Sequence, residues 1–343
     1  MIDIKLLEQL CLCNGISGDE GNVRNLIINE IKDCADDIKT DNLGNLIVFK
    51  KGKKSAKSKL MVSAHMDEVG LMVTDITSDG YLKFDEVGGI DRRVLPGKRV
   101  CVGRNGLNGV IGVKPIHLTN GDEKTAVPKM NDMYIDIGAE SREDALKYVN
   151  YGDGINFEGD FKINGKTVVT KALDDRFGCY VLINLIKSEP EYDMYFTFVV
   201  QEEVGLRGAR SAAFTVNPDF ALVIESTTAA DVAEVDVSHQ VCNLSKGATV
   251  TVMDRATVYD KEMISAAFEL AEKNNIAVQY KRAVAGGNDS GAIHQSRGGV
   301  RTLAVSLPSR YIHAPSTAAN LDDCESILKL AKVLSDYIAG GNL

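Results

Sequence analysis

Five short segments carry acidic or imidazole side chains directly beside apolar runs of the sequence. They are His65-Met66-Asp67, Asp174-Asp175, Glu202-Glu203, Glu225 and Tyr311-Ile312-His313. The chain has only five histidines, and two of them lie in these segments. Imidazole and carboxylate groups suit Zn, Co or Mn, and no cysteines accompany them as they do in a structural zinc site. Together the segments predict a catalytic metal site.

A pair of metal ions would give these residues separate tasks. In two-metal hydrolytic sites the ions lie about 3.5–4 Å apart, and Asp174 is the candidate bridge between them. Glu202 and Glu203 are adjacent in an extended segment, so their side chains point to opposite sides of the chain. One of them could therefore bind metal while the other contacts the attacking water.

Each segment also has an ordinary structural explanation. A His-x-Asp triplet is usually a surface feature, an Asp-Asp pair ahead of a helix is more often an N-cap, and a Glu-Glu pair is generally solvated. Glu225 could end a strand in solvent, and His313 could simply pack against its neighbours. The occurrence of all five segments at strand ends or helix starts favours the catalytic interpretation.

The segment Gly286-Gly287-Asn288-Asp289-Ser290 predicts a loop that caps the following helix. A structural role is favoured for Asp289, with a wall of the substrate pocket as the alternative. His117, His239 and His294 have no acidic partner at ligand spacing, so no role is assigned to them.

An alternation of strands and helices must position these segments. Short apolar runs predict strands at residues 45–49, 59–64, 194–200, 220–224, 248–252 and 302–307. Amphipathic runs predict helices at residues 6–10, 22–34, a run ending near 37, 176–188, 208–214, 260–274 and 323–339. This pattern implies an α/β fold, a mixed sheet flanked by helices. The carboxyl ends of its strands would meet in one crevice and bring the segments together.

The pattern changes between residues 71 and 163, where short β-like runs are separated by glycines. Many short strands with glycine turns are typical of a small barrel or sandwich. We therefore predict an α/β domain formed by residues 1–69 and 166–343, interrupted by a β-rich domain at residues 70–165.

Composition excludes several classes of protein. The 343 residues are 44% hydrophobic and 25% charged, which is ordinary globular composition. The net charge is -9 and no basic stripe is interleaved with aromatics, so we expect no nucleic-acid partner. No apolar stretch approaches the roughly 20 residues of a membrane helix, and no export signal is evident. Seven scattered cysteines suit a reducing cytoplasm.

The ordered motifs resemble those of a known peptidase family. SAHMDEVGLMV, KALDDRFGC, QEEVGLRGA, AGGNDSGAIH and SRYIHAPS are similar to the motifs of the glutamyl aminopeptidase family of dinuclear metallopeptidases. That family includes the tetrahedral aminopeptidases and some proteins named endoglucanases. The resemblance runs almost from end to end. It implies a zinc-aminopeptidase-like α/β domain with a small inserted β-barrel or PDZ-like dimerisation domain.

The resemblance implies two divalent metal ions per subunit, with Zn expected and Co or Mn as alternatives. His65 would bind one ion, and Asp67 would be the carboxylate that orients His65. Asp174 would bridge the two ions. Glu225 stands where the family usually has an aspartate that completes the shell of the first ion, so it adds one methylene to that position.

The remaining roles follow in the same way. Glu202 resembles the general base and acid, while Glu203 and His313 resemble ligands of the second ion. Asn288 stands where many relatives have threonine, and Thr317 where several have glutamate. Both differences could alter the substrate pocket.

The resemblance further implies short peptides as substrates and a homo-oligomer built from dimers, up to a twelve-subunit tetrahedral shell. A related dinuclear amidohydrolase, such as an acyl-amino-acid deacylase or a carboxypeptidase, is the nearest alternative. Polysaccharide hydrolysis needs two carboxyl groups that flank one bond, and carboxylates committed to metals are poor candidates. A non-catalytic peptide-binding relative is the alternative from a different class.

Overall fold

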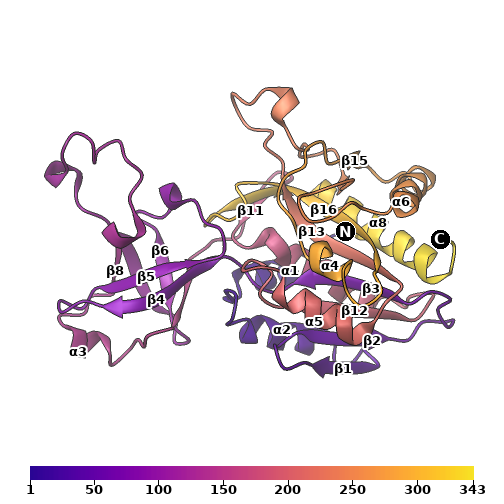
Figure 1. Cartoon of the computed structure of the whole chain (residues 1–343), viewed down its shortest axis with the longest axis horizontal. Helices are drawn as coiled ribbons and strands as arrows, with labels where there is room; N and C mark the ends of the chain where they lie inside the picture. The colour runs from indigo at the N-terminus through magenta and orange to yellow at the C-terminus, as the bar shows by residue number, and fades with distance from the viewer.

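The computed structural model describes residues 1–343 and shows two parts, each with its own hydrophobic core (Figure 1). The larger part is a sheet flanked by helices, and the smaller part is a closed β-barrel at one end of the long axis. Their cores contain 64 and 16 buried residues. The predicted fold class, an α/β sheet with an inserted β-rich barrel, is confirmed.

The large sheet has eleven strands. They are β1 (Asp37–Thr40), β2 (Leu46–Lys50), β3 (Leu60–His65), β10 (Lys162–Asn164), β11 (Thr167–Thr170), β12 (Met194–Val199), β13 (Phe220–Thr228), β14 (Ala248–Val250), β15 (Val278–Tyr280), β16 (Arg301–Arg310) and β17 (Thr317–Asn320). The main path is β1-β2-β12-β3-β13-β16-β17-β11-β10, and β14 pairs with β15 and β16.

Four neighbouring strands at the centre of this sheet run in the same direction. β12 and β13 both pair in parallel with β3, and β13 pairs in parallel with β16. All six residues of β3 are buried, as expected for a strand covered on both faces. The carboxyl ends of these four strands therefore lie at one edge of the sheet, where the functional side chains were expected to meet.

Helices pack against the sheet and complete the layers. They are α1 (Ile4–Leu12), α2 (Gly21–Ile31), α4 (Leu173–Lys187), α5 (Arg207–Val216), α6 (Lys261–Lys273), α7 (Ser290–Ile293) and α8 (Leu321–Ala339). α4 contacts α1, α2, α8 and the central strands β3 and β13. α5 contacts α7, β12 and β3. The central strands thus lie between helices.

The barrel closes in the order β4-β5-β8-β7-β6-β9. Its strands are β4 (Gly70–Ile76), β5 (Leu82–Val87), β6 (Arg99–Val102), β7 (Leu107–Gly112), β8 (Tyr134–Asp136) and β9 (Gly154–Phe157), accompanied by helix α3 (Arg142–Ala145) and the 3₁₀ turns η1 (Arg92–Val94), η2 (Ile116–Leu118) and η3 (Met130–Asp132). All of them lie within residues 70–165. β10 lies in the same range but pairs with β11 of the large sheet. The exact domain boundaries stay a prediction.

One predicted element differs from the structure. A helical run was expected to end near residue 37, but α2 ends at Ile31 and β1 begins at Asp37. β1 is mostly exposed and is held by antiparallel pairing with β2, so its conformation depends on a partner strand rather than on its own sequence. The short strands β11 and β17, which pair with each other near the site, also have no strong sequence signal.

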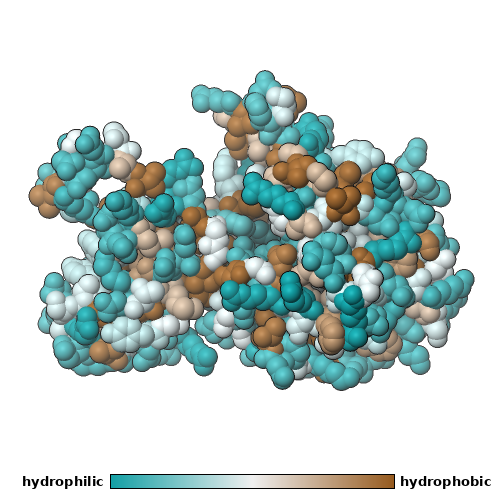
Figure 2. Space-filling model, in the orientation of Figure 1, coloured by the Kyte–Doolittle hydropathy of each residue, from teal (hydrophilic) through white to brown (hydrophobic).

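Most of the surface visible in Figure 2 is hydrophilic, with scattered hydrophobic residues and a hollow between the barrel and the larger part. None of the helices combines the length and the apolar character that crossing a membrane would require.

Candidate metal and active site

The parallel strands bring four of the five predicted segments to one edge of the sheet. His65 is the last residue of β3, and Glu202 and Glu203 are the third and fourth residues after the end of β12. Glu225 lies within β13, and His313 follows the end of β16. The fifth segment, at Asp174, opens helix α4. Residues far apart in the sequence therefore meet because their strands are neighbours.

Asp174 lies between the two histidines. Its Oδ1 is 3.4 Å from Nε2 of His65, and its Oδ2 is 3.3 Å from Nε2 of His313. The two oxygens of one carboxylate thus face two different imidazoles. This is the arrangement expected of a carboxylate that bridges two cations.

A second carboxylate approaches each histidine from the outside. Oε2 of Glu225 is 3.8 Å from Nε2 of His65, and Oε2 of Glu203 is 3.2 Å from Nε2 of His313. Asp174 therefore belongs to two sets of three groups, and within each set the ligand atoms lie within 4.8 Å of one another. Each set offers one imidazole and two carboxylates, which is a donor set that divalent Zn, Co or Mn accepts.

The residues of this cluster fit a pair of cations. Oδ1 of Asp174 and Oε1 of Glu225 are buried and have no hydrogen-bond partner. The side chains of His65, Glu203 and Glu225 are each at most 5% exposed. Buried carboxylates without partners are costly unless a cation neutralises them. We conclude that the cluster is suited to hold positive charge at two adjacent positions.

Asp67 connects the strand of His65 with the two adjacent glutamates. Its carboxylate accepts hydrogen bonds from the backbone amides of Glu202 (3.0 Å) and Glu203 (3.1 Å). Oδ1 also lies 3.5 Å from Nδ1 of His65, and the Asp67 carbonyl oxygen lies 3.0 Å from the same nitrogen. The hydroxyl of Ser17 donates to Oδ2 at 2.5 Å. Asp67 thus orients His65 and fixes the backbone of both glutamates.

Burial and charge shift the acidity of the unmetallated site. Burial holds the pKa of Glu202 well above its usual range, with Asp289 adding to this effect. Burial and the neighbouring Asp174 raise the pKa of Glu203 to about 8. Burial alone would lower the pKa of His313, but Asp174 and Glu203 outweigh it and raise the value to about 9. Without cations, the site therefore retains protons at neutral pH.

Zinc binding is consequently expected to weaken as the pH falls. Glu203 and His313 must both lose a proton before they can bind a metal ion, and their raised pKa values mean that they hold one below about pH 8. For each proton that zinc must displace, the apparent zinc affinity falls by about tenfold for every pH unit below the pKa of that group. The change of zinc affinity with pH is measured by calorimetric zinc titration at about pH 6, 7 and 8, after a chelator has removed bound metal from the protein. An affinity that stays constant over this range would contradict it.

A buried ionic cluster that the sequence analysis did not identify supports the same loops. Arg176, whose side chain is fully buried, donates to the carbonyl oxygen of Met66 at 2.7 Å and to Oε1 of Glu68 at 3.2 Å. Nζ of Lys171 donates to the same Glu68 oxygen at 2.8 Å. These contacts join the chain on both sides of Asp67 to the segment that carries Asp174. Both basic residues lie in the motif KALDDRFGC, but nothing in the sequence indicates that Met66 and Glu68 are their partners.

The barrel also contacts the site, through the loop after β5. Gly88 has a positive φ of +85°, and a Cβ at this position would lie 2.8 Å from Cγ1 of Val69 and 3.2 Å from Cβ of Glu203. The absence of a side chain here lets the barrel loop approach the metal-ligand candidate Glu203 closely.

Gly88→Ala is therefore expected to weaken zinc binding as well as to destabilise the fold. The left-handed conformation alone costs about 1–2 kcal/mol for a residue with a Cβ. Gly97→Ala is the matched control, because Gly97 has φ +78° but no atom within 4 Å of its Cβ position. Thermal unfolding and zinc titration of both variants separate the two effects. Equal zinc affinities for the two variants would show that contact with Glu203 is unimportant.

A cavity of about 140 Å³ opens beside the cluster. Besides the five site residues His65, Asp174, Glu202, Glu225 and His313, it is lined by Ser226, Thr227, Thr228, Val241, Lys281, Ala285, Gly286, Gly287, Asn288, Ser306 and Ile312. Thr317 lines a separate, smaller cavity. Asn288 is held by a hydrogen bond from its Nδ2 to the hydroxyl of Tyr259 (3.0 Å). Of the three positions at which the sequence differs from the family pattern, Glu225 and Asn288 therefore line this cavity and Thr317 does not.

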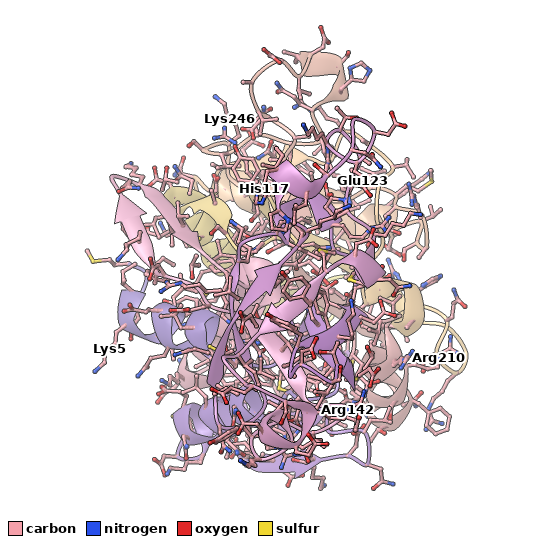
Figure 3. All side chains as sticks on the ribbon, turned by 90° about the vertical axis from the view of Figure 1, so that its left-hand side faces the viewer. Lys5, His117, Glu123, Arg142, Arg210 and Lys246 are labelled. Carbon is pink, nitrogen blue, oxygen red and sulfur yellow. The ribbon has the colours of Figure 1, made fainter.

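The remaining candidates lie elsewhere or play other parts. Helix α7 begins after Asp289 as expected, but this buried side chain makes no capping hydrogen bond and neither of its oxygens has a partner. His117 lies on η2, and Figure 3 shows it with Glu123 near the upper end of the barrel. His239 lies on the exposed 3₁₀ turn η4 (Val237–His239), and His294 is the residue that follows α7. None of these three histidines belongs to a metal-ligand group.

A mixed sheet with imidazole and carboxylate groups at the carboxyl ends of its parallel strands, joined to an inserted barrel, is the architecture of an α/β enzyme. The chain belongs to the M42 glutamyl aminopeptidase family, which matches residues 44–330. The lysyl aminopeptidase of Pyrococcus furiosus is 34% identical, and the match covers 98% of each chain. The glutamyl aminopeptidase of Lactococcus lactis subsp. cremoris is 32% identical over 90% of this chain and 88% of its own.

Solved structures agree with this assignment. The TET1 peptidase of Pyrococcus horikoshii, which can assemble into a tetrahedron or a large octahedral shell, has a TM-score of 0.86 and 40% identity, covering 96% of this chain and 98% of its own. A Thermotoga maritima endoglucanase has a TM-score of 0.80 and 39% identity, covering 96% of each chain. The resemblance seen in the sequence motifs is confirmed, and the chain is an enzyme of an aminopeptidase family.

Proposed function

We propose that this enzyme is a dinuclear metal-dependent aminopeptidase that removes N-terminal residues from short peptides, with Glu202 as its general base. The observation that carries this proposal is the position of Asp174, whose two oxygens face His65 and His313 at 3.4 Å and 3.3 Å. Membership of the M42 family supports the choice of a peptide substrate with a free N-terminus.

His65, Asp174 and Glu225 would hold one ion, and Asp174, Glu203 and His313 the other. Zn is the expected ion, with Co or Mn as alternatives, because imidazole and carboxylate ligands suit all three. When bound, such ions supply the positive charge that acidifies a water molecule and polarises the scissile carbonyl.

Glu202 is left free for proton transfer. It follows the same strand as Glu203 and belongs to a group with His65 and Glu203 whose ligand atoms lie within 4.8 Å. Its side chain makes no ion pair, and its backbone amide donates a hydrogen bond to the carboxylate of Asp67 at 3.0 Å. In the proposed reaction Glu202 takes the proton of the attacking water at its carboxylate and returns it to the amine that leaves.

Hydrolysis of aminoacyl chromogenic amides tests the proposal directly. The full-length protein is assayed with free and N-acetylated amides after chelation, and again after addition of Zn, Co or Mn. Activity that disappears with the chelator, returns with metal and requires a free amine is the expected result. Activity on acetylated amides alone would identify a deacylase. No activity with any of the metals would favour a non-catalytic peptide-binding protein.

We also propose that the enzyme assembles from dimers, up to a tetrahedral dodecamer, and that residues 70–165 form its dimerisation domain. The TET1 peptidase of known assembly is 40% identical and has the same fold. Enclosure in a shell would restrict substrates to short peptides. Light scattering that found only monomers would contradict the assembly, without affecting the proposed chemistry.

A further inference from the structure

One cation lines the cavity beside the cluster, and the proposed chemistry does not use it. Lys281 follows strand β15, and its backbone amide donates to the carbonyl oxygen of Val250 in β14 at 2.9 Å. This bond continues the pairing of the two strands and fixes the position of Lys281 at the cavity wall. The side chain therefore starts from regular, well-packed backbone.

The ammonium group of Lys281 has no carboxylate partner. Its one side-chain hydrogen bond goes to the carbonyl oxygen of Ala285, at 2.8 Å. The nearby carboxylate of Asp254 is already occupied, because it accepts from the hydroxyl of Tyr259 at 2.5 Å and from the amides of Ala256 and Thr257 at 2.8 Å. Burial lowers the pKa of Lys281. A partly desolvated ammonium without a counter-ion gains most from a carboxylate that enters the cavity.

The rest of the cavity wall suits a polar guest. Only three of its sixteen lining residues are hydrophobic, and Ser226, Thr228 and Ser306 contribute hydroxyl groups. The carboxylates that also line it are those of the metal-ligand cluster and Glu202. Bound cations would neutralise the ligand carboxylates, and Glu202 would face the attacking water in the proposed reaction. Lys281 is then the lining charge available to a substrate side chain.

We propose that Lys281 selects peptides whose N-terminal residue is acidic, by pairing with the carboxylate of that residue's side chain in this cavity. The inference rests on the proposed aminopeptidase function and adds its substrate class. Family membership does not decide the point, because one relative is a lysyl and another a glutamyl aminopeptidase. A basic N-terminal side chain would instead meet the like charge of Lys281.

The experiment compares glutamyl, glutaminyl, lysyl and leucyl p-nitroanilides with the zinc-loaded full-length protein. Glutamate and glutamine have the same shape, so their ratio of kcat/KM isolates the charge. We expect a ratio of about 10 to 100 in favour of glutamate, the range given by a hydrogen bond between charged groups. Lys281→Met, which keeps the length of the side chain, should reduce the ratio to about 1.

Arg282→Gln is the matched control, because Arg282 is the next residue and is exposed, with its guanidinium bonded to Oδ1 of Asn243 at 2.7 Å and outside the cavity lining. This variant should keep the wild-type ratio. Lys281→Gln provides a second test of the same charge, and thermal unfolding verifies that each variant folds.

Three results would overturn the inference. The first is a wild-type enzyme that cleaves the leucyl or lysyl substrate but does not favour glutamyl over glutaminyl, which leaves the aminopeptidase function intact. The second is a Lys281 variant that keeps the wild-type ratio. The third is the absence of turnover on all four substrates with every metal, which removes the proposed function and this inference with it.

Discussion

Glu202→Gln is expected to lower kcat by about 10²- to 10⁴-fold, the contribution typical of a general acid–base residue, while two zinc ions remain bound. Glutamine keeps the shape of the side chain but cannot accept the proton of the attacking water. Metal binding should persist because the two proposed ligand sets around Asp174 do not include Glu202. The backbone amide at position 202 can still donate to Asp67.

Turnover of an aminoacyl p-nitroanilide and the zinc content of the dialysed protein are measured together. The same exchange at Glu189, an exposed residue between the end of α4 and the start of β12, is the control and should leave both quantities unchanged. Near wild-type turnover with both ions bound would show that another group is the base. Loss of zinc along with turnover would instead place Glu202 among the ligands.

The arrangement of the metal-ligand candidates could be predicted because it follows from strand order. His65, Glu202 and Glu225 each end or follow an apolar run that is recognisable as a buried strand. Parallel strands present their carboxyl ends at one edge, so sequence position alone indicated that these side chains would meet. His313 was found in the same way, after the strand of residues 302–307.

Other residues could not be predicted because their contacts are tertiary. Ser17 donates to Asp67 across fifty residues of sequence, and Arg176 reaches Met66 across 110. Nothing in the local pattern of either residue indicates that partner. Lys281 resembles any surface lysine after a short strand, and only the folded chain shows that it faces the cavity of the active site.

Glu225 occupies a position at which the sequence departs from the family pattern. The longer side chain, at a position where the resemblance leads one to expect aspartate, places Oε2 at 3.8 Å from Nε2 of His65. The same oxygen accepts a hydrogen bond from the backbone amide of Ser226 at 3.1 Å, while Oε1 has no partner. The extra methylene thus leaves one oxygen anchored by the strand and the other free, which is compatible with a ligand role.

Asp67 links the strand of His65 to the segment of Glu202 and Glu203. One carboxylate holds the imidazole of His65 and both amides of the Glu202-Glu203 pair. A residue that positions a ligand through a hydrogen bond typically affects metal affinity or activity by about 10- to 100-fold when it is replaced. Asp67 therefore contacts the proposed base Glu202 and one ligand candidate of each proposed ion position, His65 and Glu203, without being a ligand itself.

Asp174→Asn is expected to have a larger effect on zinc affinity, since it changes the ligand that is proposed to be shared by both ions. The amide nitrogen of asparagine does not coordinate a metal ion, so at least one of the two sets that share Asp174 loses a ligand. The other set keeps only a neutral oxygen, which is a weaker ligand than a carboxylate. Replacing a residue that only positions a ligand lowers zinc affinity by up to about 100-fold. Asp174→Asn should lower it by more than that, and turnover should fall as well.

Asp175→Asn is the control that tests the assignment of the bridge. The two aspartates are adjacent, but the oxygens of Asp175 accept from the backbone amides of Gly178 (2.9 Å) and His65 (3.3 Å) rather than facing the two imidazoles. Asparagine retains one of these acceptors, so this variant should still bind two zinc ions. Calorimetric titration of the chelated proteins gives the number of ions and their affinities. The assignment would be wrong if Asp174→Asn bound two ions normally and Asp175→Asn did not. Asp175 would then be the bridge, and the two histidines would face Asp174 for a reason other than metal binding.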